Sequence, residues 1–166
     1  MAISETVTVN APLDQVVTAF GNEDFARYVS QRLRVTLDSF SVAGDTAGSF
    51  TATSVRGVPA DRVPDMAKKF VSKGLSLTQT DQVSDANADG SRVVTTEIKA
   101  GGVPISAKAV QTLTAVGEAT KVDVNGEVNS SIPFVGKKIA ATAEPYAGKA
   151  LSLVARSLEE WLKTNS

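Results

Sequence analysis

The sequence contains no histidine and no cysteine in its 166 residues. These absences exclude a cysteine nucleophile, a histidine base, disulfides, and zinc or haem sites built from the usual ligands. Aromatic residues are scarce at 5%, and cationic and anionic residues nearly balance, giving a net charge of -1. With a pI of about 5.5 and no basic cluster, nucleic-acid binding is disfavoured. We therefore expect no metal, no cofactor and no nucleic-acid partner.

Long hydrophobic runs are missing as well. No stretch of about 18 apolar residues is present, and the segment Met1–Glu5 lacks the charged and apolar regions of a signal peptide. We expect a cytoplasmic protein without stable membrane anchoring. The length of 166 residues and the hydrophobic content of 42% suit a single domain over residues 1–166.

The chain opens with an alternating pattern over residues 3–9. Ile3, Val7 and Val9 share one face with Glu5, while serine and threonine take the other face. This pattern predicts a half-buried strand with one carboxylate on its apolar side.

Two helix starts follow this strand. Pro12 with Asp14 is typical of a first helical turn, and the apolar spacing continues to Gly21. Asn22 precedes a second acidic first turn, whose apolar residues recur at helical spacing up to Leu33. Two short helices are predicted.

The middle of the chain is rich in valine, threonine and serine, with Gly and Asp clusters about every ten residues, which predicts strands. We place these strands at residues 34–43, 48–56, 75–84, 91–100, 105–116 and 121–130. Turn signals at Gly44-Asp45, Asp89-Gly90 and Gly117-Glu118 join neighbouring strands as hairpins. The predicted sheet is therefore an antiparallel meander.

Two helical segments complete the pattern. Between Pro59 and Lys73 a short amphipathic helix is expected, ended by Gly74. After the segment Ile132–Gly136 one long helix runs to about Lys163, kinked near Pro145. Its apolar stripe contains the residues Ile139, Ala143, Tyr146, Ala147, Ala150, Val154, Leu158 and Trp161. We expect the end of this stripe to pack against the two early helices through Val16, Phe20 and Phe25.

This order resembles the START-like, or SRPBCC, helix-grip superfamily across nearly the whole chain. The junction Val7–Val16, VTVNAPLDQV, and the long final helix carry the resemblance. The segment Ile132–Ile139, IPFVGKKI, is similar more particularly to an uncharacterised bacterial family, domain of unknown function 2505. The implied fold is α+β: a seven-stranded antiparallel curved sheet wrapped around a long C-terminal helix, with two short helices after strand 1.

The resemblance implies a cavity between sheet and helix, in which superfamily members bind lipids or other apolar molecules. Our leading hypothesis is non-catalytic binding of such a molecule, with one or two polar groups setting its orientation. Candidate lining residues are Phe50, Met66, Phe70, Leu75, Leu77, Ile139, Ala143, Tyr146 and Ala150. Glu5 is the candidate polar contact. The small alanines of the helix stripe suit either a cavity or close packing.

Two other functions stay open. A hydrolase or cyclase on the same scaffold would use the carboxylate of Glu5 or Glu97, or the hydroxyl of Tyr146. We rank this hypothesis below binding. A packed protein-interaction module without a cavity is the third hypothesis.

The segment Asp85–Gly90 matches half of a calcium loop, but Thr96 stands where the closing carboxylate belongs. A polar hairpin without a metal is the preferred interpretation.

Overall fold

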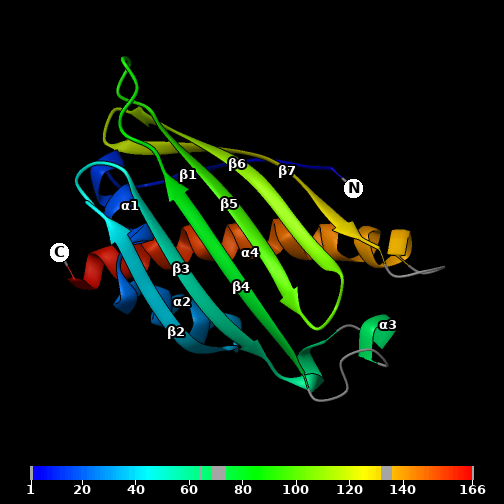
Figure 1. Ribbon diagram of the computed structural model, residues 1–166. Helices are drawn as coiled ribbons and strands as arrows, with labels where there is room; N and C mark the ends of the chain where they lie inside the picture. Colours follow the sequence, from blue (N-terminus) through cyan, green and yellow to red (C-terminus); the bar gives the residue numbers. More distant parts are fainter. Residues whose placement is uncertain (1, 64, 69–73, 132–135, 166) are drawn as a thin grey trace.

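The computed structural model describes residues 2–63, 65–68, 74–131 and 136–165. Along the chain the elements are β1 Ala2–Val9, α1 Leu13–Phe20, α2 Glu23–Leu33, β2 Thr36–Gly44, β3 Phe50–Val58, a 3-10 turn Ala60–Arg62, α3 Asp65–Lys68, β4 Leu75–Val83, β5 Arg92–Gly101, β6 Ile105–Val116, β7 Ala119–Ser130 and α4 Gly136–Asn165. The strands form one curved sheet with α4 crossing one of its faces (Figure 1).

The sheet has seven strands in the order β1-β7-β6-β5-β4-β3-β2, and all neighbours are antiparallel. This arrangement confirms the predicted meander and the α+β helix-grip fold. The three predicted hairpin turns are also confirmed. Gly90 and Gly117 adopt φ angles of +86° and +63° there, a conformation in which a side chain is strained.

The faces of β1 and β7 are those that the alternation predicted. On β7, Val122, Val124 and Val128 are buried, and the intervening residues turn outward. On the outer face of β1, the Thr6 hydroxyl donates to Asp123 Oδ1 at 2.9 Å. Because directly paired residues share a face, the register places Glu5 on the inner face opposite Val124.

The two early helices have clear local causes. Pro12 precedes the first turn of α1, which carries Asp14. The Asn22 side chain caps α2 by accepting from the Phe25 amide at 3.1 Å, and α2 ends at Arg34 in the left-handed conformation. Both helices bury an apolar face.

These buried faces meet the second half of α4. Leu158 is 4% exposed and belongs to one core cluster with Val16 and Phe25, while Trp161 packs against that cluster. The rings of Phe25 and Trp161 lie 5.4 Å apart between centroids. The predicted packing of the helix end against the early helices is confirmed. Beyond this cluster, α4 runs along β1 and β7.

The segment between β3 and β4 was expected to hold one short helix. The structure shows the 3-10 turn and the four-residue α3, which lie beyond the end of the sheet (Figure 1). Phe70 falls outside the described residues, and the Met66 backbone lies within α3.

The segment Asp85–Gly90, which matches half of a calcium loop in sequence, lies in the turn between β4 and β5. The Asp89 carboxylate accepts from both the amide and the hydroxyl of Ser91, and these bonds lower its pKa. This carboxylate therefore stabilises the turn that joins the two strands.

Trp161→Ala should lower the free energy of unfolding by about 3 kcal/mol, because it removes an aromatic side chain packed on the main core. Urea denaturation measures the loss. Val110→Ala, at an exposed position on β6, is the control and should change stability by less than about 0.5 kcal/mol. A loss below about 1 kcal/mol for Trp161→Ala would show that the helix end does not depend on this contact.

Candidate functional site

The inner face of the sheet, which faces α4, divides into two halves. The first half lies toward α1 and is packed. Phe50, Val83, Val94 and Leu113 follow one another across β3, β4, β5 and β6, and each is at most 3% exposed. They belong to the cluster that holds the end of α4, so this half is ordinary protein core.

The second half lies toward α3, and we call it the open half. Its apolar inner-face residues are Leu75, Leu77, Ile98, Ala100, Ile105 and Ala107. All of them are only half-buried. Some contact two small clusters around Val103 and around Ile3 with Val128, which are separate from the main core. An apolar, concave and partly accessible surface of this kind suits an apolar ligand.

Hydrogen-bonded polar side chains separate the two halves, and we call them the polar band. Its members are Arg56, Gln79, Asp81, Thr96 and Gln111. They come from four adjacent strands, β3 to β6, and share the inner face because paired residues in neighbouring strands point the same way. The band thus crosses the middle of the sheet beneath the layer of α4.

Asp81 is the centre of the band. Its Oδ1 accepts from the Thr96 hydroxyl at 2.6 Å, and its Oδ2 accepts from Gln79 Nε2 at 2.9 Å. Gln111 Nε2 in turn donates to Thr96 Oγ1 at 2.9 Å. The Asp81 side chain receives hydrogen bonds from both sides and is 6% exposed as a residue.

Arg56 forms the cationic end of the band. Its Nε donates to Ser30 Oγ at 2.9 Å, and its Nη1 donates to Ser54 Oγ at 3.0 Å and to Gln79 Oε1 at 3.1 Å. Gln79 therefore links the guanidinium of Arg56 to the carboxylate of Asp81. Ser30 comes from α2, so the band is also tied to a helix.

Burial changes the acidity of both charged groups. It raises the pKa of Asp81, and the hydrogen bonds from Thr96 and Gln79 and the charge of Arg56 offset only part of this effect. Burial also lowers the pKa of Arg56, against the influence of Asp81. Perturbed ionisable groups inside a concave site are typical of functional sites.

The lining residues expected from the sequence are distributed unevenly. Leu75 and Leu77 lie in the open half, whereas Phe50 lies in the packed half. Ala150 is half-buried on α4. The side chains of Met66, Ile139, Ala143 and Tyr146, and Phe70 as a whole, lie outside what the structure describes.

Glu5 lies under the middle of α4. An added Cβ at Gly148 would stand 3.1 Å from Glu5 Oε1, so the glycine allows helix and carboxylate to approach closely. Glu5 remains exposed. It shares the inner face with Val124 and Gln111, at the same level as the polar band.

Glu97 turns away from this interior. Its neighbour Thr96 belongs to the polar band, so Glu97 takes the outer face, where it pairs with Lys99 at 2.9 Å and Lys108 at 3.4 Å. These lysines lower the pKa of Glu97. This carboxylate cannot take part in chemistry inside the grip.

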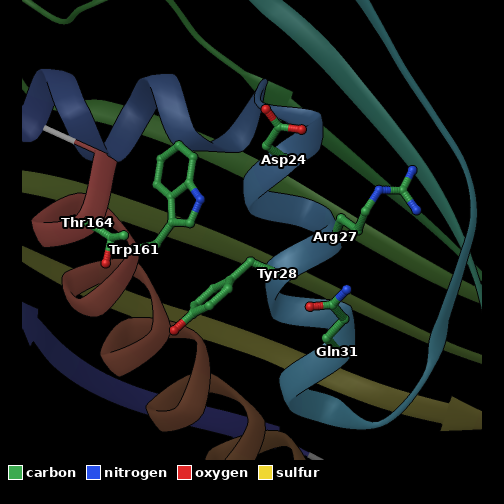
Figure 2. Close-up of a pocket in the computed structure, with 6 residues that line it drawn as sticks. All are labelled: Asp24, Arg27, Tyr28, Gln31, Trp161 and Thr164. Carbon is green, nitrogen blue, oxygen red and sulfur yellow. The ribbon is translucent and has the colours of Figure 1, made fainter.

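Two open grooves lie outside the interior. The first, about 280 Å³, lies between α2 and the end of α4, and its lining residues are Asp24, Arg27, Tyr28, Gln31, Trp161 and Thr164 (Figure 2). The second, about 580 Å³, follows the β2–β3 and β4–β5 ends of the sheet and includes the outer-face residues Thr51, Gln82 and Thr95. Neither groove contains a member of the polar band.

The polar band was not predicted from the sequence. The available signal was in β4, LSLTQTDQV, where polar residues occupy both faces in the second half of the strand. A half-buried strand normally keeps one face apolar. Gln79 and Asp81 break that pattern and mark the site.

The architecture and its interior site define a START-like helix-grip protein. The chain belongs to the family described as protein of unknown function DUF2505, which it matches over residues 4–162. No match was found among curated proteins.

Solved structures share the fold at low sequence identity. The protein TTHA0849 from Thermus thermophilus is 12% identical, with a TM-score of 0.62 over 100% of this chain and 99% of the other. A START superfamily protein from Mycobacterium smegmatis is 12% identical, with a TM-score of 0.56 over 99% of each chain. Norcoclaurine synthase from Thalictrum flavum, in complex with dopamine and hydroxybenzaldehyde, is 14% identical, with a TM-score of 0.51 over 100% of this chain and 88% of the other. Within the described part of this chain, no helix has the length and apolar character needed to span a membrane.

Asp81→Asn should change how stability depends on pH. Because the folded-state pKa of Asp81 is raised, wild-type stability contains a contribution that falls as pH increases from about 4, the ordinary aspartate value, through the folded-state pKa. Asparagine does not ionise, so the unfolding free energy of the variant should rise relative to wild type over this range. Urea denaturation between pH 4 and pH 8 measures the difference. Glu118→Gln, in the exposed β6–β7 turn, is the control, and a pH-independent difference for Asp81→Asn would contradict the assignment.

Gly148→Ala should stabilise the protein by up to about 1 kcal/mol, because alanine favours a helix and the flexible end of Glu5 can move by a few tenths of an ångström. Combining it with Glu5→Ala should increase the gain, since the contact at 3.1 Å is then absent. Thermal denaturation of the single and double variants measures this coupling.

Gly126→Ala is the contrasting variant. Its added Cβ would meet the backbone oxygen of Lys108 and the Cβ of Ala109, at 2.8 Å from the latter. The sheet cannot yield as a side-chain end can, so a marked loss of stability is expected. An equal effect of Gly148→Ala in the presence and in the absence of the Glu5 side chain would show that Glu5 does not lie against α4.

Proposed function

We propose that this protein binds a small, mainly apolar or lipid-like molecule between the open half of the sheet and α4. The main support for this proposal is a contrast between the two halves of the inner face of the sheet. Four neighbouring apolar residues are buried in the packed half, whereas the six apolar residues of the open half remain partly accessible beside the partly buried polar band. Affinity would come from burial of apolar surface, at roughly 25 cal/mol per Å².

The anchoring of α4 supports this proposal. Leu158 and Trp161 hold the end of the helix on the packed half. The first half of α4, which carries Ile139, Ala143 and Tyr146, lies at the same end of the molecule as α3 (Figure 1). A ligand held between these surfaces would contact apolar groups along its length and the polar band at one end.

The proposed activity is binding, for sequestration or transport, and not catalysis. The polar band supplies one carboxylate, Asp81, and both of its oxygens already accept hydrogen bonds within the band. Such a group orients a ligand through its partners. A general base would instead need a substrate proton within hydrogen-bond reach.

Ala107→Phe should fill the open half and abolish uptake of a neutral apolar probe, N-phenyl-1-naphthylamine, while leaving the unfolding free energy nearly unchanged. Ala107 is half-buried on the inner face of β6, opposite Ile98. Val110→Phe, at a position 46% exposed on the outer face of the same strand, is the matched control and should bind the probe like wild type. Fluorescence titration and urea denaturation give the two readouts.

Ala143→Phe and Ala150→Phe add the same bulk at two alanines of the predicted apolar stripe of α4. If wild type took up no probe and all three filling variants lost about 1–3 kcal/mol, the interior would be a packed core and the interaction-module hypothesis would stand. Native mass spectrometry of protein from its own host, which detects a retained small molecule, identifies the ligand directly.

A further inference from the structure

The guanidinium of Arg56 has one nitrogen that the polar band does not use. Its Nε and both hydrogens of Nη1 are committed to Ser30, Ser54 and Gln79. Among the described residues, none is recorded as accepting a hydrogen bond from Nη2. Nη2 thus carries two N–H donors without an acceptor among the described residues, on a side chain that pairs with Leu77 of the open half.

The charge of Arg56 is also compensated only at a distance. Among the described residues it forms no salt bridge. The nearest compensating carboxylate in the band is Asp81, which is separated from it by the side chain of Gln79. An oxygen anion placed on Nη2 forms a charge-assisted hydrogen bond, about twice as strong as a neutral one.

The surface next to this donor is apolar. Leu77 pairs directly with Arg56 across β3 and β4, and Ala100 pairs with Leu77 on β5. Ile98 and Ala107 continue the apolar surface toward β6. A molecule anchored at Arg56 would therefore lay a hydrocarbon part on these residues.

We propose that the ligand is an amphipathic monocarboxylate whose carboxylate accepts from Arg56 Nη2 and whose apolar part covers the open half. This inference rests on the proposed function and adds the chemistry of the ligand's polar end. Ser30, Ser54 and Gln79 are positioning residues, because they hold the guanidinium with Nη2 free. A neutral oxygen acceptor, such as an alcohol or an ester, is the competing chemistry.

The test compares dodecanoate with methyl dodecanoate and 1-dodecanol as competitors of N-phenyl-1-naphthylamine at pH 8, where the acid is ionised. Wild type should bind dodecanoate at least tenfold more tightly than the two neutral compounds. Arg56→Met should remove that preference and leave the affinity for the ester unchanged. Arg56→Lys keeps the positive charge but not the planar guanidinium, so it should retain part of the preference for dodecanoate.

Arg56→Met leaves Asp81 without its cation and can fail to fold, so the neutral double variant Arg56→Met/Asp81→Asn is measured as well. Arg27→Met, which removes an exposed guanidinium from α2, is the control and should keep the preference for dodecanoate.

The outcomes separate the two proposals. Equal wild-type affinities for acid, ester and alcohol would overturn the carboxylate inference and leave the binding function intact, as would a preference for acid that survives in both Arg56→Met variants. Failure of wild type to bind the probe or any dodecyl compound would overturn the binding function itself.

Discussion

The structure depends on the packing of the end of α4 against the early helices and the sheet. Leu158 and Trp161 join the core cluster that also contains Val16 and Phe25. Glu160 strengthens this contact on the surface, where it accepts from Arg32 at 2.7 Å and from Tyr28 at 3.1 Å, although such exposed bonds contribute little on their own. Since one end of the helix is held in this way, the other half need not be buried in a second core.

The polar band marks where the packed core stops. A buried carboxylate and guanidinium oppose folding unless their hydrogen bonds are satisfied, and a hydrophobic replacement in the same place would extend the core across the sheet. Here every oxygen of Asp81 has a donor, and Arg56 has three recorded bonds. The band therefore keeps polar groups inside the grip at a tolerable energetic cost.

Members of one fold class differ in function because the interior side chains differ. Norcoclaurine synthase has the same architecture at 14% identity, which relates the two proteins by fold alone. In this protein the distinctive interior feature is a cation held by neutral partners beside an apolar surface. Its location on rigid strands, and not on loops, fixes the orientation of the guanidinium.

The sequence alone determined the order of the elements and the faces of β1 and β7, because apolar spacing, proline, asparagine and glycine act locally. It predicted the hairpins, the valine face of β7 and the contact between Trp161 and the early helices. It did not predict that Arg56, Gln79, Asp81, Thr96 and Gln111 meet, since these residues are separated along the chain and look like ordinary polar strand residues. Only the strand register brings them onto one inner face. There burial shifts the pKa values of Asp81 and Arg56, and their hydrogen bonds become necessary for stability. The tertiary structure likewise decided that Phe50 belongs to the packed core and Leu77 to the open half, because their places across the sheet depend on long-range pairing.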